Sequence, residues 1–166
     1  MIIESIRKIT KCHLETHLMI ENPNASLDQY IKAGSDTIIF HLEASNNPIE
    51  DLEYIRDNNI CAGIAINPNT DPNLLKPLLN HLDYILIMSV FPGKGGQTFI
   101  ADTLKKMEYI VSMRGKMEIT IGVDGGVNIN TIDDVYSTDI DITIVGSGLY
   151  GANDIKKRYN QLIGKE

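Results

Sequence analysis

The 166-residue sequence has no tryptophan and only two cysteines, Cys12 and Cys61. The cysteines form no Cys-x-x-Cys pair and no Cys/His ligand spacing, which excludes a zinc finger and indicates a reduced, cytoplasmic protein. No run of lysine or arginine stands out and the net charge is -7, which argues against nucleic-acid partners. No apolar run approaches a membrane span and the first residues contain no signal-peptide core, so no membrane partner is expected.

The remaining composition is that of an ordinary globular protein. Hydrophobic residues make up 43% of the chain and charged residues 22%. A chain of this length can bury a real core, and neither a low-complexity segment nor a linker-like composition interrupts it. We therefore expect a single domain over residues 1–166.

Six short apolar runs, mostly β-branched, alternate with longer amphipathic stretches. The runs cover residues 13–20, 37–43, 61–67, 84–90, 118–124 and 142–147. Continuous runs of this kind are typical of strands that are buried on both faces. Helical patterns follow at 26–34, 48–58, 72–80, 98–113, 130–137 and 153–163. Strict alternation predicts a parallel α/β sheet with right-handed crossovers.

Two architectures fit this alternation, an open doubly wound sheet and part of a (β/α)8 barrel. Polar or glycine residues stand at the C-terminal end of nearly every run: His41, Glu43, Asn67, Ser89, Asp124, Gly146 and Ser147. A ring of such residues, instead of one switch point, favours the barrel. Six strands are two short of the usual eight, so we expect an incomplete (β/α)8 TIM barrel of about six β/α units.

The most informative segment is Ile121-Gly122-Val123-Asp124-Gly125-Gly126, in which an apolar run ends in a carboxylate followed by two glycines. Asp124 suits a general acid/base or a metal ligand, but a turn aspartate that caps the next helix fits equally well. Glycine-rich ends on the last two runs, at Gly125-Gly126 and at Gly146-Ser147-Gly148, together indicate a phosphate site.

Histidines, methionines and one glycine-rich loop supply the other candidates. His41 is either a hydrogen-bonded structural residue or, if a carboxylate faces it, a ligand for Zn, Fe or Mn. His17, Met19 and Met88 are candidate pocket walls, although methionines there are as often core filler. The loop after the fourth run, with glycines at positions 93, 95 and 96, is either a plain flexible turn or an active-site flap.

The segment Ile85–Phe99, with Met-Ser-Val-Phe-Pro-Gly-Lys-Gly-Gly-Gln at its centre, resembles the second signature of the ribulose-phosphate 3-epimerase family. Further motifs follow in the family's order and spacing: His17-Leu18-Met19, Phe40–Ala44, Asn67-Pro68, Val123–Val127 and Val145–Ser147. The resemblance covers nearly the whole chain. It implies a (β/α)8 barrel that interconverts ribulose 5-phosphate and xylulose 5-phosphate in the pentose phosphate pathway.

The resemblance also implies roles for single residues. Family members hold a divalent metal (Zn, Fe, Mn or Co) with two histidines and two aspartates, and the two aspartates are the acid/base pair. His41 matches the second histidine, and Asp124 matches the second aspartate. The residues that match the sugar-phosphate grip and the flap are Gly125, Gly126, Gly146, Ser147, Gly93, Gly95 and Gly96.

Nothing in the sequence matches the family's first signature, His-x-Asp-x-x-Asp-Gly, and residues 1–10 resemble the helix that follows it. We therefore expect a chain that starts about two strands and one helix late, binds metal weakly with two of four ligands, and is an impaired isomerase. A non-catalytic sugar-phosphate-binding remnant and an incomplete gene sequence are the alternatives, and a hexulose phosphate such as allulose 6-phosphate is an alternative substrate. Unpaired edges at 13–20 and 142–147 predict self-association or marginal stability.

Overall fold

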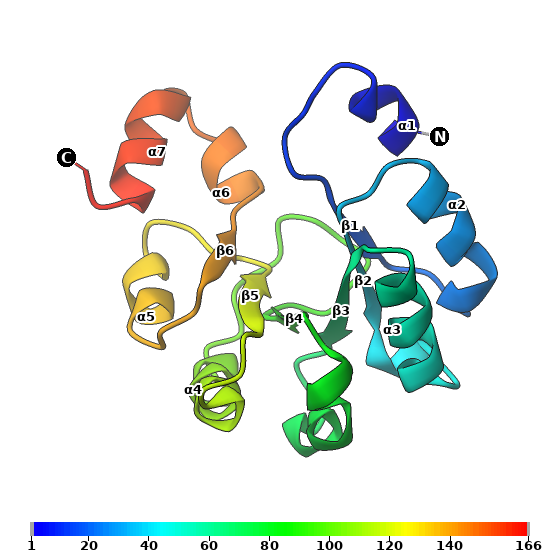
Figure 1. Cartoon of the computed structure of the whole chain (residues 1–166). Coiled ribbons are helices and arrows are strands. Elements are labelled where there is room, and N and C mark those ends of the chain that lie inside the picture. Colours follow the sequence, from blue (N-terminus) through cyan, green and yellow to red (C-terminus); the bar gives the residue numbers. More distant parts are fainter. Residues whose placement is uncertain (1, 166) are drawn as a thin grey trace. The chain divides into compact units, whose positions relative to one another are not determined.

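The computed structural model describes residues 2–165, and all six expected strands are present (Figure 1). They are β1 (Glu15–Leu18), β2 (Thr37–His41), β3 (Cys61–Ile66), β4 (Tyr84–Met88), β5 (Thr120–Asp124) and β6 (Ile142–Ile144). Each strand lies inside the apolar run that predicted it. The strand order is β1-β2-β3-β4-β5-β6, and the pairs β1–β2, β2–β3 and β5–β6 are parallel.

The strand order decides between the two predicted architectures. A doubly wound sheet reverses its strand order at a switch point, whereas neighbouring strands in a barrel follow the chain. The order here runs in sequence from β1 to β6 without reversal. The (β/α) barrel prediction is therefore the one that the topology supports.

Helices and 3-10 segments separate the strands (Figure 1). The α-helices are α1 (Ile2–Arg7), α2 (Leu27–Lys32), α3 (Pro48–Asp57), α4 (Thr103–Arg114), α5 (Ile132–Tyr136), α6 (Ser147–Tyr150) and α7 (Ile155–Leu162). The 3-10 segments are η1 (Pro23–Ser26), η2 (Leu42–Ala44) and η3 (Pro72–His81). No helix among residues 2–165 is long and apolar enough to cross a membrane.

Two helix predictions need correction. The pattern at 72–80 forms the 3-10 segment η3 and not an α-helix, because Pro77 inside it has no N–H and its ring would clash with an α-helical carbonyl. The pattern at 98–113 becomes helical only at Thr103. The residues before it belong to the loop, where Ile100 N–H donates to the Ser89 carbonyl at 2.9 Å.

The chain divides into two compact units. Unit 1 comprises the residues up to Ile66 together with Asn73–Leu86, and unit 2 comprises Asn67–Pro72 together with the residues from Ile87 onward. Each unit has fully buried apolar side chains of its own: Ile38, Ile39, Phe40, Leu52, Ile55, Ile64 and Leu75 in unit 1, and Met107, Ile110, Ile121, Val123 and Val135 in unit 2. The single domain expected over 1–166 stays a prediction.

One tertiary pattern recurs three times at the amino ends of the strands. An aspartate directly before β2, β4 or β6 accepts a hydrogen bond from a backbone N–H at the start of the preceding strand, and it pairs with an arginine near the end of a helix. The sets are Asp36 with Leu14 and Arg7, Asp83 with Ala62 and Arg56, and Asp141 with Ile121 and Arg114. Each set ties a helix end to two neighbouring strands.

Candidate functional site

Asp124 is the last residue of β5, and Ser89 holds its main chain in place. The Asp124 carbonyl oxygen accepts hydrogen bonds from the Ser89 N–H at 2.8 Å and from the Ser89 Oγ at 3.0 Å. The same hydroxyl lies 2.6 Å from the carbonyl oxygen of Gly125. Because Ser89 is completely buried, its hydroxyl fixes the two peptide groups at the point where the chain leaves the strand.

The Asp124 carboxyl is electrostatically perturbed. Burial raises its pKa above the usual aspartate value, and a hydrogen bond from the Gly125 N–H opposes this shift. A carboxyl that keeps its proton at a higher pH than an ordinary aspartate is closer to the range in which proton transfer is efficient. A perturbed carboxyl of this kind is a candidate for acid/base catalysis.

The two residues after Asp124 must be glycines, because their backbone has a positive φ and because neighbouring atoms leave no room for a Cβ. Gly125 and Gly126 have φ of +120° and +67°, where side chains with a Cβ are disfavoured. A Cβ on Gly125 would lie 2.4 Å from the Val90 Cγ2, and one on Gly126 would lie 2.5 Å from the Phe99 backbone nitrogen. The turn therefore packs directly against the end of the predicted flap.

The flap itself is held at its base and open at its tip. The Gln97 side-chain amide donates to the Phe91 carbonyl at 2.6 Å and to the Lys94 carbonyl at 2.8 Å. The three tip glycines face open space, since a Cβ on any of them would have no described atom within 4 Å: Gly93, Gly95 and Gly96. This combination is what a loop that approaches a ligand needs.

The glycine-rich turn after β6 lies against the turn after β5. A Cβ on Gly148 would be 2.4 Å from the carbonyl oxygen of Val127. Gly146 precedes α6, Ser147 is its first residue, and a Cβ on Gly146 would meet no described atom. The two predicted halves of the phosphate site are therefore adjacent in unit 2.

In unit 1, His17 of β1 and His41 of β2 form a close pair. Their Nε2 atoms are 2.9 Å apart and their ring centroids 5.0 Å apart, with an interplanar angle of 24°. Burial, with a smaller contribution from the neighbouring His41, lowers the pKa of His17 to about 4. His17 is consequently a neutral imidazole at physiological pH. A single N–H, on the Nε2 of one of the two rings, accounts for the hydrogen bond between them.

The second ring nitrogen of His41 is nearly enclosed. His41 is 5% exposed, and its Nδ1 lies 3.4 Å from Glu43 Oε2 without a hydrogen bond. A buried imidazole nitrogen that lacks a hydrogen bond is available to another partner. This atom is the best observation in favour of the predicted ligand role of His41.

The predicted pocket-wall residues occupy different environments. His17 and Met19 line a cavity of about 320 Å³ in unit 1, together with Ile2, Ile3 and Tyr30. Met19 is 49% exposed, whereas Met88 at the end of β4 is 1% exposed. Met88 therefore packs in the interior of the molecule.

His17 and His41 in unit 1, and Asp124 in unit 2, each carry donor atoms of a kind that binds divalent cations. Imidazole nitrogens at His17 and His41 and a carboxylate at Asp124 are ligands that Zn²⁺ and its neighbours accept. Among residues 2–165, however, no group of three or more histidine, cysteine, aspartate and glutamate side chains could hold a metal ion. No complete metal centre is present in this part of the chain.

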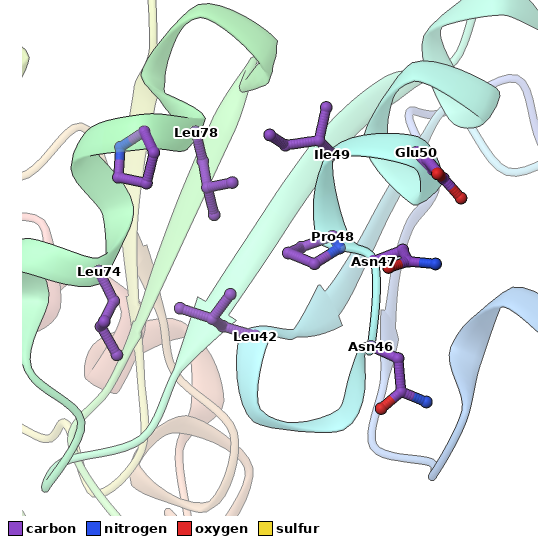
Figure 2. Close-up of a pocket in the computed structure, with 9 residues that line it drawn as sticks. Leu42, Asn46, Asn47, Pro48, Ile49, Glu50, Leu74 and Leu78 are labelled. Atoms are coloured by element: carbon purple, nitrogen blue, oxygen red, sulfur yellow. The ribbon is translucent and has the colours of Figure 1, made fainter.

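A larger pocket lies elsewhere in unit 1, between the start of α3 and η3 (Figure 2). It has a volume of about 590 Å³ and is lined by Leu42, Asn46, Asn47, Pro48, Ile49, Glu50, Leu74, Pro77 and Leu78. Figure 2 shows Leu42, Pro48 and Ile49 facing Leu74 and Leu78 across the gap. None of the predicted site residues lines this pocket.

Two residues acquire importance only in the structure. Ser89 is a single hydroxyl at the end of the apolar run Tyr84–Met88, a signal that marked its position but not its bond to Asp124. Lys106 gives no sequence signal, because it looks like any lysine on an amphipathic helix. Its ammonium nevertheless donates to three backbone carbonyls of the loop after β3.

Comparisons with known proteins show the family of the chain. A model of the ribulose-phosphate 3-epimerase family matches residues 1–150. The ribulose-phosphate 3-epimerase of Bacillus subtilis (strain 168) is 34% identical over 169 residues, which cover 100% of this chain and 78% of that protein. The ribulose-phosphate 3-epimerase of Mycobacterium tuberculosis (strain ATCC 25618 / H37Rv) is 37% identical over 155 residues, covering 92% and 68%.

Solved structures with low sequence identity share the fold. A crystal structure of 3-hexulose-6-phosphate synthase matches with a TM-score of 0.74 at 16% identity, covering 99% of this chain and 79% of that one. A ligand complex of KGPDC from Streptococcus mutans matches with a TM-score of 0.78 at 14% identity, covering 98% and 77%. The fold is thus that of an incomplete (β/α)8 barrel, and the chain belongs to the ribulose-phosphate 3-epimerase family of isomerases.

Proposed function

We propose that this chain inverts the configuration at C3 of a ketopentose phosphate, interconverting ribulose 5-phosphate and xylulose 5-phosphate. The observation that carries the proposal is Asp124, a carboxyl with a raised pKa whose main chain is fixed by Ser89 at the end of β5. Epimerisation requires removal of a proton from carbon and its return on the opposite face, and a positioned carboxyl performs one such transfer.

The phosphate is bound by the two adjacent turns of unit 2. Backbone N–H groups of Gly126, Gly146 and Ser147 provide donors, and the glycines have no side chain that would keep an anion at a distance. Gly125, whose N–H donates to the Asp124 carboxyl, shapes the first of the two turns. The flap glycines Gly93, Gly95 and Gly96 allow the loop to close over the sugar and exclude water. His17 and Met19 are proposed as pocket walls in unit 1, whereas Met88, which is 1% exposed, is a core residue and is not proposed as one.

We infer metal dependence from the family and not from a complete centre among the described residues 2–165. We propose His41 and Asp124 as ligands of a divalent ion (Zn, Fe, Mn or Co), which would supply positive charge beside the substrate oxygens. Binding should be weak, because this donor set contains fewer ligands than the four that the family resemblance implies.

Catalysis by this chain should be impaired. The sequence contains Asp124 but no match to the family's other acid/base aspartate, so one proton transfer would depend on water. A single general acid/base group contributes about 10²–10⁴-fold to rate. The alternative is a non-catalytic sugar-phosphate binder.

The test is turnover of ribulose 5-phosphate by the purified chain in deuterated water, with added Zn²⁺, Fe²⁺, Mn²⁺ or Co²⁺. We expect slow formation of xylulose 5-phosphate that carries deuterium at C3, and loss of this activity in Asp124→Asn. Asp134→Asn, a change at an exposed carboxylate of α5, is the matched control. Allulose 6-phosphate as a second substrate distinguishes pentulose from hexulose specificity.

Three results are informative. Turnover that Asp124→Asn does not reduce would contradict the role of Asp124. Calorimetric binding of ribulose 5-phosphate without turnover would establish the non-catalytic binder. Neither binding nor turnover under any metal condition would refute both functions.

Self-association is a further part of the proposal. β1 and β6 are the terminal strands in the strand order, so each has one hydrogen-bonded neighbour. Unpaired strand edges promote pairing with another chain. Sedimentation velocity should show oligomers whose population rises with concentration, and a monomer at every concentration would contradict this expectation.

A cytoplasmic location, suggested by the free cysteines Cys12 and Cys61, stays a prediction.

A further inference from the structure

Lys106 makes the densest set of side-chain to main-chain bonds described in unit 2. Its Nζ lies 2.9 Å from the carbonyl oxygen of Asn67, 2.7 Å from that of Pro68 and 2.7 Å from that of Thr70. An ammonium has three N–H donors and no acceptor, so three carbonyl oxygens from one loop match its capacity. Hydrogen bonds to a charged donor are also stronger than those between neutral groups.

The loop that Lys106 holds comes directly after β3, which ends at Ile66. Loops at the carboxyl ends of barrel strands build the active sites of barrel enzymes. Asn67, the first residue of this loop, is also one of the positions that match the family's motif order. The Asn67 carbonyl additionally accepts the Thr70 N–H at 3.1 Å, so the loop forms a tight turn around the ammonium.

A second observation supports a link between this loop and the rest of unit 2. The segment Asn67–Pro72 groups with the residues from Ile87 onward, although the residues on either side of it belong to unit 1. Lys106 lies on α4, the helix that follows the flap. Its three bonds join that helix to a loop that is nearly forty residues away in sequence.

We propose that Lys106 is a positioning residue for the epimerase reaction: its ammonium fixes the loop after β3 and thereby the place of Asn67 at the end of that strand. The proposal rests on the proposed function. Without the ammonium, three carbonyl oxygens lose a charged donor at once, and the turn Asn67–Thr70 relaxes. Displacement of a positioning group by about 1 Å can lower a rate by about 10²-fold.

The test compares Lys106→Met with two matched variants. Lys105→Met removes the preceding lysine of α4, which is exposed, and Ile110→Val trims a fully buried side chain of the same helix. The first control isolates the loss of charge on α4, and the second isolates a general loss of stability. Lys106→Gln, which keeps amide donors, replaces Lys106→Met if that variant does not fold.

Two readouts separate positioning from a merely structural role. In Lys106→Met we expect kcat to fall at least about tenfold with KM nearly unchanged, because the phosphate grip lies on other loops. Hydrogen exchange of the Thr70 amide should accelerate beyond any change in global stability. Lys105→Met and Ile110→Val should show neither effect.

The outcomes are decisive in each direction. If Thr70 exchanges no faster in Lys106→Met than in Ile110→Val, the inference is wrong. It is also wrong if the two variants lose the same fraction of kcat. An inactive wild-type chain would refute the proposed epimerase function, and the exchange measurement would still decide whether Lys106 fixes the loop.

Discussion

Asp36 allows a sharp test of the recurring aspartate pattern at the amino ends of the strands. Its Oδ2 accepts the Leu14 N–H at 2.7 Å and also pairs with the Arg7 guanidinium. These two bonds link α1, the start of β1 and the start of β2. Replacement of Asp36 by alanine removes both at once, and it leaves a backbone N–H without its acceptor.

The expected loss can be estimated from the two contacts. A hydrogen bond to a charged group contributes about 1.5–3 kcal/mol, whereas an exposed ion pair contributes about 0–1 kcal/mol. The Asp36 side chain is 41% exposed, so solvent screening weakens both contributions. We expect Asp36→Ala to lower the free energy of unfolding by about 2 kcal/mol, which corresponds to roughly 4–8 °C in Tm for a chain of this size.

The effect should depend on pH in a defined direction. The hydrogen bond from the Leu14 N–H holds the pKa of Asp36 below its usual value of 3.8; burial opposes this shift, and the Arg7 guanidinium adds to it. A carboxyl with a lowered pKa in the folded state stabilises the fold above the unfolded value, and this contribution disappears as pH falls through the folded value. The difference between wild type and Asp36→Ala should therefore be full at neutral pH and shrink below about pH 4.

Urea unfolding of wild type, Asp36→Ala, Asp36→Asn and Asp28→Ala measures these quantities. Asp36→Asn keeps an oxygen for the Leu14 N–H and should lose less than Asp36→Ala. Asp28→Ala is the control, since Asp28 pairs with Lys32 one turn along an exposed helix face, at 2.6 Å. Equal losses in Asp36→Ala and Asp28→Ala would refute the argument that the link between helix and strands stabilises the fold.

Three further outcomes are expected. Gly126→Ala should lower the free energy of unfolding by about 2 kcal/mol or more and speed proteolytic cleavage within the flap, because φ at this position is +67° and the new Cβ would meet the Phe99 backbone. An unchanged Tm together with an unchanged cleavage rate would contradict this. Asp124→Asn should gain stability relative to wild type as pH rises from the ordinary aspartate pKa toward neutral, because the wild-type carboxyl binds its proton more tightly in the folded than in the unfolded state. Parallel plots of the free energy of unfolding against pH for the two proteins, measured with urea, would exclude the raised pKa. Wild type should lose about 2 kcal/mol of its free energy of unfolding between neutral pH and about pH 5, because His17 takes up a proton in the unfolded state before it does so in the folded state, where its pKa is about 4. His17→Gln should remove this loss, which calorimetry at the two pH values measures. A loss that persists in His17→Gln would exclude His17 as its source.

The sequence was sufficient to predict the central strands because they are buried on both faces, whereas β1 alternates between half-buried and buried residues and β6 has no buried residue. All five residues of β2 and all five of β4 are buried, so their apolar runs have no polar interruption to obscure them. The helices were harder to place. Pro77 converts a helical pattern into η3, and the bond from Ile100 to Ser89 keeps the residues before Thr103 out of α4. Both differences come from backbone hydrogen bonding, which hydrophobic periodicity does not encode.

The candidate site could be predicted in part. Asp124 and the glycines of both turns were recognisable, because glycine at a strand end indicates a positive φ or a close approach. Gly126 shows both, with φ of +67° and the Phe99 backbone nitrogen 2.5 Å from a Cβ built on it. The close pair of His17 and His41 was not predicted, since their contact depends on the register between β1 and β2, in which His17 lies opposite Ile39. Register is a property of the folded sheet and not of either run alone.

Ser89 and Lys106 show why the remainder of a site escapes a sequence pattern. Motifs identify side chains whose own chemistry is unusual for their position, such as a carboxylate after an apolar strand. Ser89 and Lys106 act instead on main-chain carbonyls, those of Asp124 and Gly125 in one case and of the loop from Asn67 to Thr70 in the other. Any backbone offers such acceptors, so the sequence carries no partner signal for them. Buried or half-buried donors that bond to the loops at the carboxyl ends of strands therefore become visible only in the structure, independently of any family resemblance.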